Sequence, residues 1–299
     1  MSDRPPSRHA RTVAVAALVT GFVLFVLAIA LAFDDDDGGG GGGDGTRASG
    51  TTATTPRTAR RPRPRAPVYP AEPAVPANAP GAHRDAEESV PILAYDVINS
   101  PREGTADPSI WVPPEEFREQ MAFLADNGYH AITMRQLWAA WREKGLLPSK
   151  PVVISFDTGY HSVYANALPA MRERAFSGVL FLDPNQTQSD FPVSEVQALI
   201  RAGWELGAQP AGDNLDVLAA RRTLQRRFRR RVQFFSYPEG RFDPSAPEAL
   251  ESSGFLAAVT LDEGLASPDD PRYELDRIPV RNGDGAEGLE RKLGEAADG

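Results

Sequence analysis

Short apolar runs alternate with amphipathic stretches through residues 90–299 of this chain. The apolar runs predict strands at 90–97, 130–134, 151–156, 177–182, 232–237 and 256–260. The amphipathic stretches predict helices at 113–127, 135–144, 162–174, 193–202, 215–231 and 245–253. This repeated alternation requires a mostly parallel sheet, either open or closed into a barrel.

A second hydrophobic pattern lies near the N-terminus, where residues 12–33 carry no charge. At roughly 1.5 Å per residue they cover about 30 Å, which is enough for one bilayer crossing. Arginines precede this stretch and the acidic run 34–37 follows it, so we expect residues 1–11 to be cytoplasmic and the C-terminal domain to be extracytoplasmic. A secreted protein with a cleaved signal peptide is the alternative. The length of the stretch favours the single-pass signal anchor.

Residues 34–89 join this anchor to the predicted domain. They contain a glycine run at 38–43 and a segment rich in Thr, Ala, Arg and Pro at 51–80. Such composition buries too little apolar surface to offset the loss of chain entropy on folding. The sequence therefore predicts a disordered linker over 34–89 and one folded domain over 90–299.

Composition narrows the chemistry that the domain can perform. The chain has 299 residues, no Cys, four His and a formal net charge of −9. This excludes disulfides, thiol nucleophiles and Cys-type zinc sites. The arginine-rich stretch 221–231 has an apolar face, so it predicts a solvated amphipathic helix. Together with export and the acidic balance, this argues against nucleic acid as a partner.

Polar side chains follow several of the predicted strands, at the edge where parallel α/β folds carry their chemistry. The segments concerned are VPILAYDVI (90–98), WVPPEEFREQMAFLADNGYHAITMRQL (111–137), PVVISFDTGYHSVYANALP (151–169), GWELGAQPAGDNLDVL (203–218) and FFSYPEGRFD (234–243). In this order they resemble the opening strand, the segment before the first motif, and the first, second and third motifs of the polysaccharide deacetylases. That family is also known as the NodB homology domain of carbohydrate esterase family four.

The resemblance implies a distorted (β/α) barrel that removes acetyl groups from chitin, peptidoglycan or related glycans with a divalent metal. In working members, the first motif supplies an aspartate general base followed by a metal-binding aspartate. The second motif supplies two histidine ligands. The metal polarises the acetyl carbonyl and activates the attacking water, and the carboxylate takes the proton.

This chain departs from that pattern at every metal position. Asp157 keeps the general-base position, but the ligand positions hold Thr158, Gln209 and Asp213. A hydroxyl and an amide are poor zinc ligands. The histidine general acid of the last motif is also missing, because no His follows His161. We therefore expect no zinc and no cofactor.

Two interpretations follow from these substitutions. In the first, the domain is a pseudoenzyme that binds an envelope glycan, peptidoglycan or exopolysaccharide, in the remaining groove. In the second, it is an active hydrolase in which Asp96, Asp157 and Asp213 form an all-oxygen site for a hard cation such as Ca²⁺ or Mg²⁺. In both, the resemblance places the third-motif residues in the substrate groove: Tyr237, Pro238, Glu239, Gly240 and Arg241.

Overall fold

The computed structural model describes residues 67–186, 191–211 and 216–298. The predicted cytoplasmic tail 1–11, the predicted membrane segment 12–33 and the first part of the predicted linker lie outside these residues. Within the described part of the chain, no helix combines the length and the apolar character that a bilayer crossing needs.

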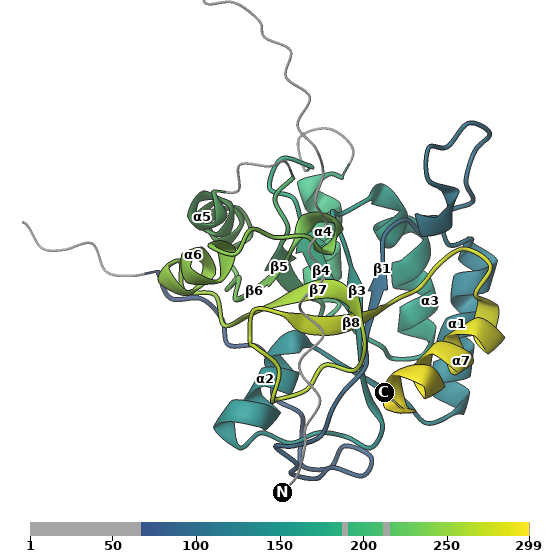
Figure 1. The fold of residues 1–299 in the computed structure, drawn as a ribbon, viewed down its shortest axis with the longest axis horizontal. Helices are drawn as coiled ribbons and strands as arrows, with labels where there is room; N and C mark the ends of the chain where they lie inside the picture. The colour runs from purple at the N-terminus through teal and green to yellow at the C-terminus, as the bar shows by residue number, and fades with distance from the viewer. Residues whose placement is uncertain (1–66, 187–190, 212–215, 299) are drawn as a thin grey trace, which may run out of the picture. The chain divides into compact units, whose positions relative to one another are not determined.

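A parallel β-barrel forms the centre of the domain (Figure 1). Its strands are β1 Ile92–Tyr95, β2 His130–Ile132, β3 Pro151–Phe156, β4 Val179–Leu182, β5 Glu205–Ala208, β6 Phe234–Ser236, β7 Ala257–Glu263 and β8 Leu275–Pro279. All strands except β2 form a closed ring, because β1 pairs with both β3 and β8. The predicted (β/α) barrel is therefore confirmed.

The distortion of the barrel is located at β3. One edge of this strand pairs with β1. The other edge is shared, since β2 pairs with Pro151–Val153 and β4 pairs with Ser155 and Phe156 further along the strand. β2 thus lies outside the ring, and β3 carries three neighbours instead of two.

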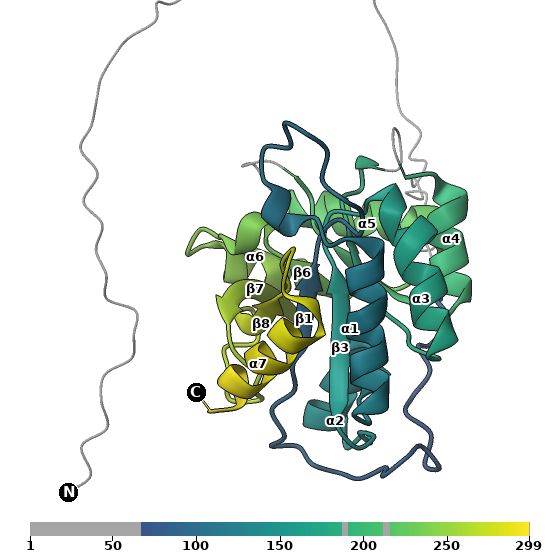
Figure 2. The ribbon, with the colours of Figure 1, turned by 90° about the vertical axis from the view of Figure 1, so that its right-hand side faces the viewer.

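Helices cover the outside of the barrel (Figure 2). They are α1 Pro114–Asp126, α2 Met134–Glu143, α3 Leu168–Glu173, α4 Val193–Arg201, α5 Val217–Phe228, α6 Ala246–Ser252 and α7 Gly285–Asp298. The predicted helix 162–174 is divided into a π-helical turn, Val163–Ala167, and α3. The C-terminal helix α7 lies beside α1 in both Figure 1 and Figure 2.

The core has two parts, and the alternation of side chains along the strands separates them. On β3, Val152, Ile154 and Phe156 pack against the surrounding helices. Val153 points the other way and packs with Phe181 and Phe234 inside the barrel, where α2 contributes Met134, Leu137 and Trp141. Further along the strands the buried residues become polar: Ser155, Asp157, Ser236 and Arg277. This change marks the end of the barrel that holds the site.

The folded unit begins earlier in the chain than the sequence predicted. The backbones of His83 and Leu147 exchange two hydrogen bonds, and the Trp141 indole donates to the Glu88 carbonyl. Val75 packs against the part of the core that contains Val153, Phe181 and Phe234. The prediction that the linker extends to residue 89 is therefore wrong for residues 67–89. Their composition is poor in apolar residues, but backbone hydrogen bonds and a few apolar anchors attach them to the barrel.

Candidate functional site

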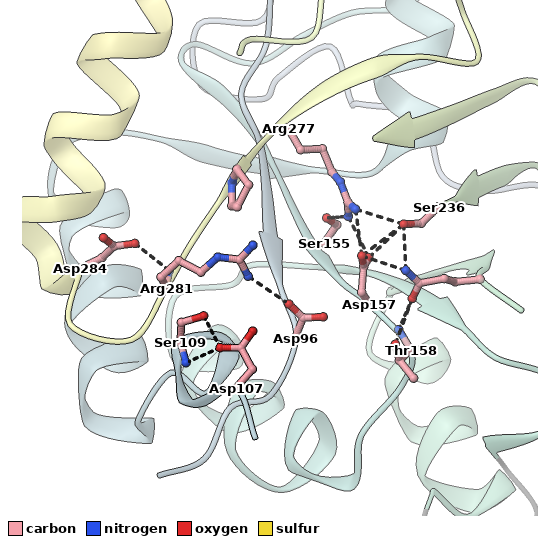
Figure 3. Close-up of polar contacts among 12 residues, drawn as sticks. Asp96, Asp107, Ser109, Ser155, Asp157, Thr158, Ser236, Arg277, Arg281 and Asp284 are labelled. Atoms are coloured by element: carbon pink, nitrogen blue, oxygen red, sulfur yellow. Dashed lines mark hydrogen bonds and ion pairs between the residues drawn. The ribbon is translucent and has the colours of Figure 1, made fainter. Parts of the chain in front are cut away.

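Asp157 lies directly after β3, at the carboxyl end of the barrel. Its backbone N–H donates to the Tyr95 carbonyl at 2.8 Å, which continues the β1–β3 ladder by one residue. Its side chain is only 6% exposed. Both carboxylate oxygens bind the Arg277 guanidinium, Oδ1 to Nη1 and Oδ2 to Nη2, each at 2.8 Å (Figure 3). This two-bond geometry fixes the plane of the carboxylate.

Arg277 comes from β8 and is fully buried. Its Nε donates to the Thr260 carbonyl at 2.6 Å, and its Nη1 also reaches the Ser155 hydroxyl at 3.3 Å. The guanidinium lies over the Phe181 ring, 5.9 Å from its centroid. A buried charge is tolerated when it is paired and hydrogen-bonded, and Arg277 meets both conditions.

Gln209 follows β5 and connects Asp157 to Thr158. Its Nε2 donates to Asp157 Oδ2 at 3.0 Å and to the Ser236 hydroxyl at 3.2 Å. Its Oε1 accepts the backbone N–H of Thr158. The orientation of the amide is fixed by chemistry, because the reverse orientation would put two oxygens together at Asp157 and two N–H groups together at Thr158.

The turn after β3 has an unusual backbone. Thr158 has φ 66°, a left-handed value that is costly for a β-branched residue. Gly159 has φ 91°, and a Cβ there would lie 2.4 Å from Leu182 Cδ1. Only glycine therefore fits at residue 159, and the turn directs the Thr158 N–H toward Gln209 Oε1.

A cleft of about 580 Å³ opens beside these residues. Its walls include Asp96, Asp107, Ile110, Asp157, Thr158, Tyr160, Gln209, Pro210, Ala211, Pro238, Glu239, Leu261 and Arg281. Asp96 and Asp157 therefore line one cleft. Asp213, the third member of the predicted oxygen site and the last degenerate ligand position, lies outside the described residues.

Asp96 differs electrostatically from Asp157. It pairs with Arg281 at 3.5 Å. Burial and the charge of Asp157 together raise the pKa of Asp96 to about 6, although Arg277 and Arg281 lower it. Asp96 therefore carries a less stable negative charge than an ordinary surface aspartate.

The third-motif residues divide between cleft and core. Pro238 and Glu239 line the cleft. The side chain of Tyr237 is fully buried and its ring stacks on Phe242 at 4.5 Å, so this side chain belongs to the core. Gly240 and Arg241 are not among the lining residues in the described part of the chain, and Arg241 pairs with Glu239 on the surface.

The described ligand positions do not fit the metal that the family fold implies. Thr158 and Gln209 supply a hydroxyl and an amide, and the carbonyl oxygen of that amide already accepts a hydrogen bond. Within residues 67–186, 191–211 and 216–298, no group of three His, Cys, Asp or Glu side chains could hold an ion. Zinc needs imidazole, thiolate or carboxylate ligands in a set of about three.

The fold and the site together are those of a parallel (β/α) barrel with a polar cleft at the carboxyl ends of its strands. Residues 144–258 match the family model described as Polysaccharide deacetylase. The YxkH protein of Bacillus subtilis (strain 168) is 26% identical over 207 residues, which cover 65% of this chain and 72% of YxkH. Residues 144–258 thus match the polysaccharide deacetylase family, and the relatives support the resemblance of this chain to its NodB homology domain.

Other relatives agree with this assignment. The poly-beta-1,6-N-acetyl-D-glucosamine N-deacetylase of Staphylococcus epidermidis is 21% identical over 198 residues, 57% of this chain and 68% of that protein. The structure of the Streptococcus pyogenes deacetylase PplD in complex with acetate has a TM-score of 0.64 at 20% identity, covering 69% of this chain and 99% of PplD. IcaB from Ammonifex degensii has a TM-score of 0.60 at 19% identity, covering 68% of this chain and 96% of IcaB. At these identities the structures establish the fold alone.

Sequence reasoning missed Arg277. The strand LDRIP contains a charged residue on the same face as Leu275, which packs inside the barrel. An arginine on the inward face of a strand needs a buried acidic partner, and Asp157 follows β3, which lies two strands away from β8 across β1. The sequence alone did not identify the pair, because LDRIP lacks the composition of an ordinary strand.

Proposed function

We propose that this chain binds an envelope glycan, peptidoglycan or exopolysaccharide, in the cleft beside Asp157 and lacks efficient metal-dependent deacetylation. The observation that carries the proposal is the position of Gln209. Its amide bridges the general-base position Asp157 and the ligand position Thr158. The group that replaces the first metal-binding histidine thus satisfies its neighbours without a metal.

The bridge opposes metal binding energetically. A metal at this position would have to compete with the Thr158 N–H for Gln209 Oε1, and the amide nitrogen would still face Asp157. Breaking such buried hydrogen bonds costs about 1–3 kcal/mol for each group left unpaired. A neutral amide and a hydroxyl coordinate zinc weakly, so binding the ion would offset little of that cost.

Asp157 is also poorly placed to act as a base. An ionised carboxylate has about four lone-pair positions. The two Arg277 bonds, the Gln209 amide and the Ser236 hydroxyl already donate to Asp157. The same saturation opposes the all-oxygen hydrolase, because a hard cation would need a free oxygen of Asp157 in addition to Asp96 and Asp213.

The glycan is supported by the family and by the cleft. Relatives include proteins named for N-deacetylation of poly-beta-1,6-N-acetyl-D-glucosamine. The cleft keeps a volume of about 580 Å³ with polar and apolar walls, which lies within the roughly 300–1,000 Å³ of small-molecule sites.

We further propose that residues 12–33 anchor the chain in the cell membrane with the domain outside the cytoplasm. The uncharged stretch and its flanking charges support this orientation. Membrane fractionation tests it directly. Recovery of a chain shortened at its N-terminus in the soluble secreted fraction would instead favour signal cleavage.

Metal titration and glycan pelleting test the proposed function together. We expect the purified full chain to sediment with peptidoglycan or extracted exopolysaccharide and to show no saturable zinc binding by calorimetry. The triple variant Thr158→Asp, Gln209→His and Asp213→His should gain zinc binding, whereas Gln209→His alone should not. Absence of glycan retention, with or without added Ca²⁺, would contradict the binding role. Tight zinc binding by the unaltered chain would contradict loss of the metal site.

A further inference from the structure

We propose that the cleft selects glucosamine units with free amines over N-acetylated units, so that this chain recognises the product of its family's reaction. This inference rests on the proposed glycan binding and adds the chemical class of the ligand. It depends on three properties of the cleft: an underpaired carboxylate, an excess of negative charge, and walls suited to a sugar ring.

The two aspartates at the cleft differ in how well they are hydrogen-bonded. Asp157 receives donors from Arg277, Gln209 and Ser236. Asp96 receives one long contact, from Arg281 Nη1 to its Oδ2 at 3.5 Å, and no other hydrogen bond to its carboxylate is found among the described residues. Its side chain is nevertheless only 23% exposed. Asp96 is therefore the carboxylate at the cleft that still requires donors.

The charges around Asp96 favour a cation. Arg277 neutralises Asp157, and Arg241 pairs with Glu239 at the rim. Asp107 stays ionised, because the Ser109 hydroxyl and backbone N–H lower the pKa of Asp107. Of the described residues that line the cleft, Asp96 and Asp107 then face a single unshared cation, Arg281, which leaves an excess of one negative charge (Figure 3).

Apolar groups form other parts of the wall. Ile110, Leu261 and Tyr160 line the same cleft as Asp96. Such groups pack against the C–H faces of a sugar ring and leave its polar substituents to the charged side. A ring held there would present its nitrogen to a carboxylate instead of to a metal.

A free amine meets the needs of Asp96 better than an acetamide does. An ammonium group carries three N–H donors and a positive charge. The acetamide of N-acetylglucosamine carries one N–H and no charge, and it would bring a carbonyl oxygen toward two carboxylates. A hydrogen bond between charged groups is about twice as strong as a neutral one. The cleft therefore discriminates by charge.

The pH dependence follows from both partners. The groups that face Asp96 are Asp157, Arg277, Arg281, Asp107 and Tyr160. Burial and the Asp157 charge raise the pKa of Asp96 to about 6, so Asp96 is ionised above that pH. Amines beside electron-withdrawing groups, as in an α-amino group, lose their proton near pH ~8. Preference for the free amine should be greatest between these limits and should fall on either side.

Calorimetry with two probes tests the inference. The probes are a β-1,6-linked N-acetylglucosamine oligomer and the same oligomer with free amines, each titrated into the purified full chain near pH 7. We expect the free-amine oligomer to bind about tenfold more tightly or better, the factor that one charge-assisted hydrogen bond supplies. Asp96→Asn should bring the two affinities close to equal. The matched control Asp298→Asn, an exposed residue at the end of α7, should leave the ratio unchanged.

Each outcome is decisive. Equal affinities, or tighter binding of the acetylated oligomer, would overturn the inference and leave glycan binding intact. Binding of neither oligomer would overturn the inference, and the pelleting assay with peptidoglycan and exopolysaccharide would decide the glycan-binding role separately. The pH profile of the unaltered chain provides a measurement that no misfolded variant can disturb, and a preference that stays constant from pH 5 to ~9 would exclude Asp96 and the amine as its source.

Discussion

Asp157 and Arg277 form a buried ion pair, and each side chain brings a charge into the barrel. The pair is separated by 120 residues along the chain. Removing either charge leaves the other buried without a counterion. Removing both charges leaves no unpaired charge, so apolar side chains of similar volume can take their place. The site is therefore sensitive to single substitutions and more tolerant of paired ones.

We predict that Arg277→Met lowers the free energy of unfolding by about 3–5 kcal/mol, since Asp157 would be left as an uncompensated buried charge. Urea denaturation measures this. The double variant Arg277→Met with Asp157→Leu should be more stable than the Arg277→Met single variant. The control Arg118→Met removes an exposed pair with Glu115 and should cost less than about 1 kcal/mol. A small loss for Arg277→Met would show that the pair contributes little to stability.

Glu205 provides a pH-dependent prediction at the other end of the barrel. This carboxyl is 4% exposed at the start of β5 and accepts the Arg135 backbone N–H at 3.0 Å. Burial and the charge of the neighbouring Glu72 raise the pKa of Glu205 to about 8, although the Arg135 backbone N–H lowers it. The folded state thus keeps a proton that the unfolded state releases near pH ~4.3.

Because the folded state binds more protons than the unfolded state between these two pKa values, a rise in pH favours unfolding. Stability should fall by a few kcal/mol as the pH rises from the unfolded pKa toward about 8, and should then level off. Glu205→Gln should flatten this slope in denaturation measured across the range, whereas the exposed Glu248→Gln should preserve it. An unchanged slope in Glu205→Gln would assign the pH dependence to other groups.

The sequence identified some site residues and not others for a physical reason. Asp157 and Thr158 follow an apolar strand, so their place at the carboxyl edge could be predicted, whereas Gln209 is located by its resemblance to the second motif. Arg277 could not be recognised in the same way, because its role depends on a partner that only the closed barrel brings near. The pairing of Gln209 with Thr158 likewise depends on the left-handed turn.

Among the elements, predictions succeeded where apolar residues dominate. The strand predicted at 151–156 coincides with β3, whose residues are all buried. β5, β8 and α7 were missed. β5 contains Glu205 and Gly207, β8 contains Asp276 and Arg277, and α7 contains several glycines, so none has the composition of an ordinary strand or helix. Tertiary packing overrides these local preferences.

Segment 67–89 is the element whose boundary changed most, and truncation tests its contribution. A chain that begins at residue 67 should unfold with nearly the same free energy as the full chain. A chain that begins at residue 90 should lose about 2 kcal/mol or more, because the His83–Leu147 and Glu88–Trp141 hydrogen bonds and the burial of Val75 disappear. Equal stability of the two truncated chains would show that residues 67–89 contribute nothing.

The described domain combines the fold of a polysaccharide deacetylase with a site in which side chains supply the counterion and the hydrogen bonds of Asp157. Arg277 and Gln209 satisfy Asp157, so neither the fold nor the cleft requires an ion to balance that carboxylate. A chelator should therefore leave the melting temperature of the purified chain unchanged. A chelator-induced decrease in Tm would reveal a structural metal that the account does not include.

Acetate release is the most direct test of the central claim. The full chain would be incubated with an N-acetylglucosamine oligomer, with and without added Zn²⁺, and in parallel with a chelator. We expect no acetate above the protein-free blank under any of these conditions. Release of acetate by the unaltered chain that the chelator abolishes would contradict it.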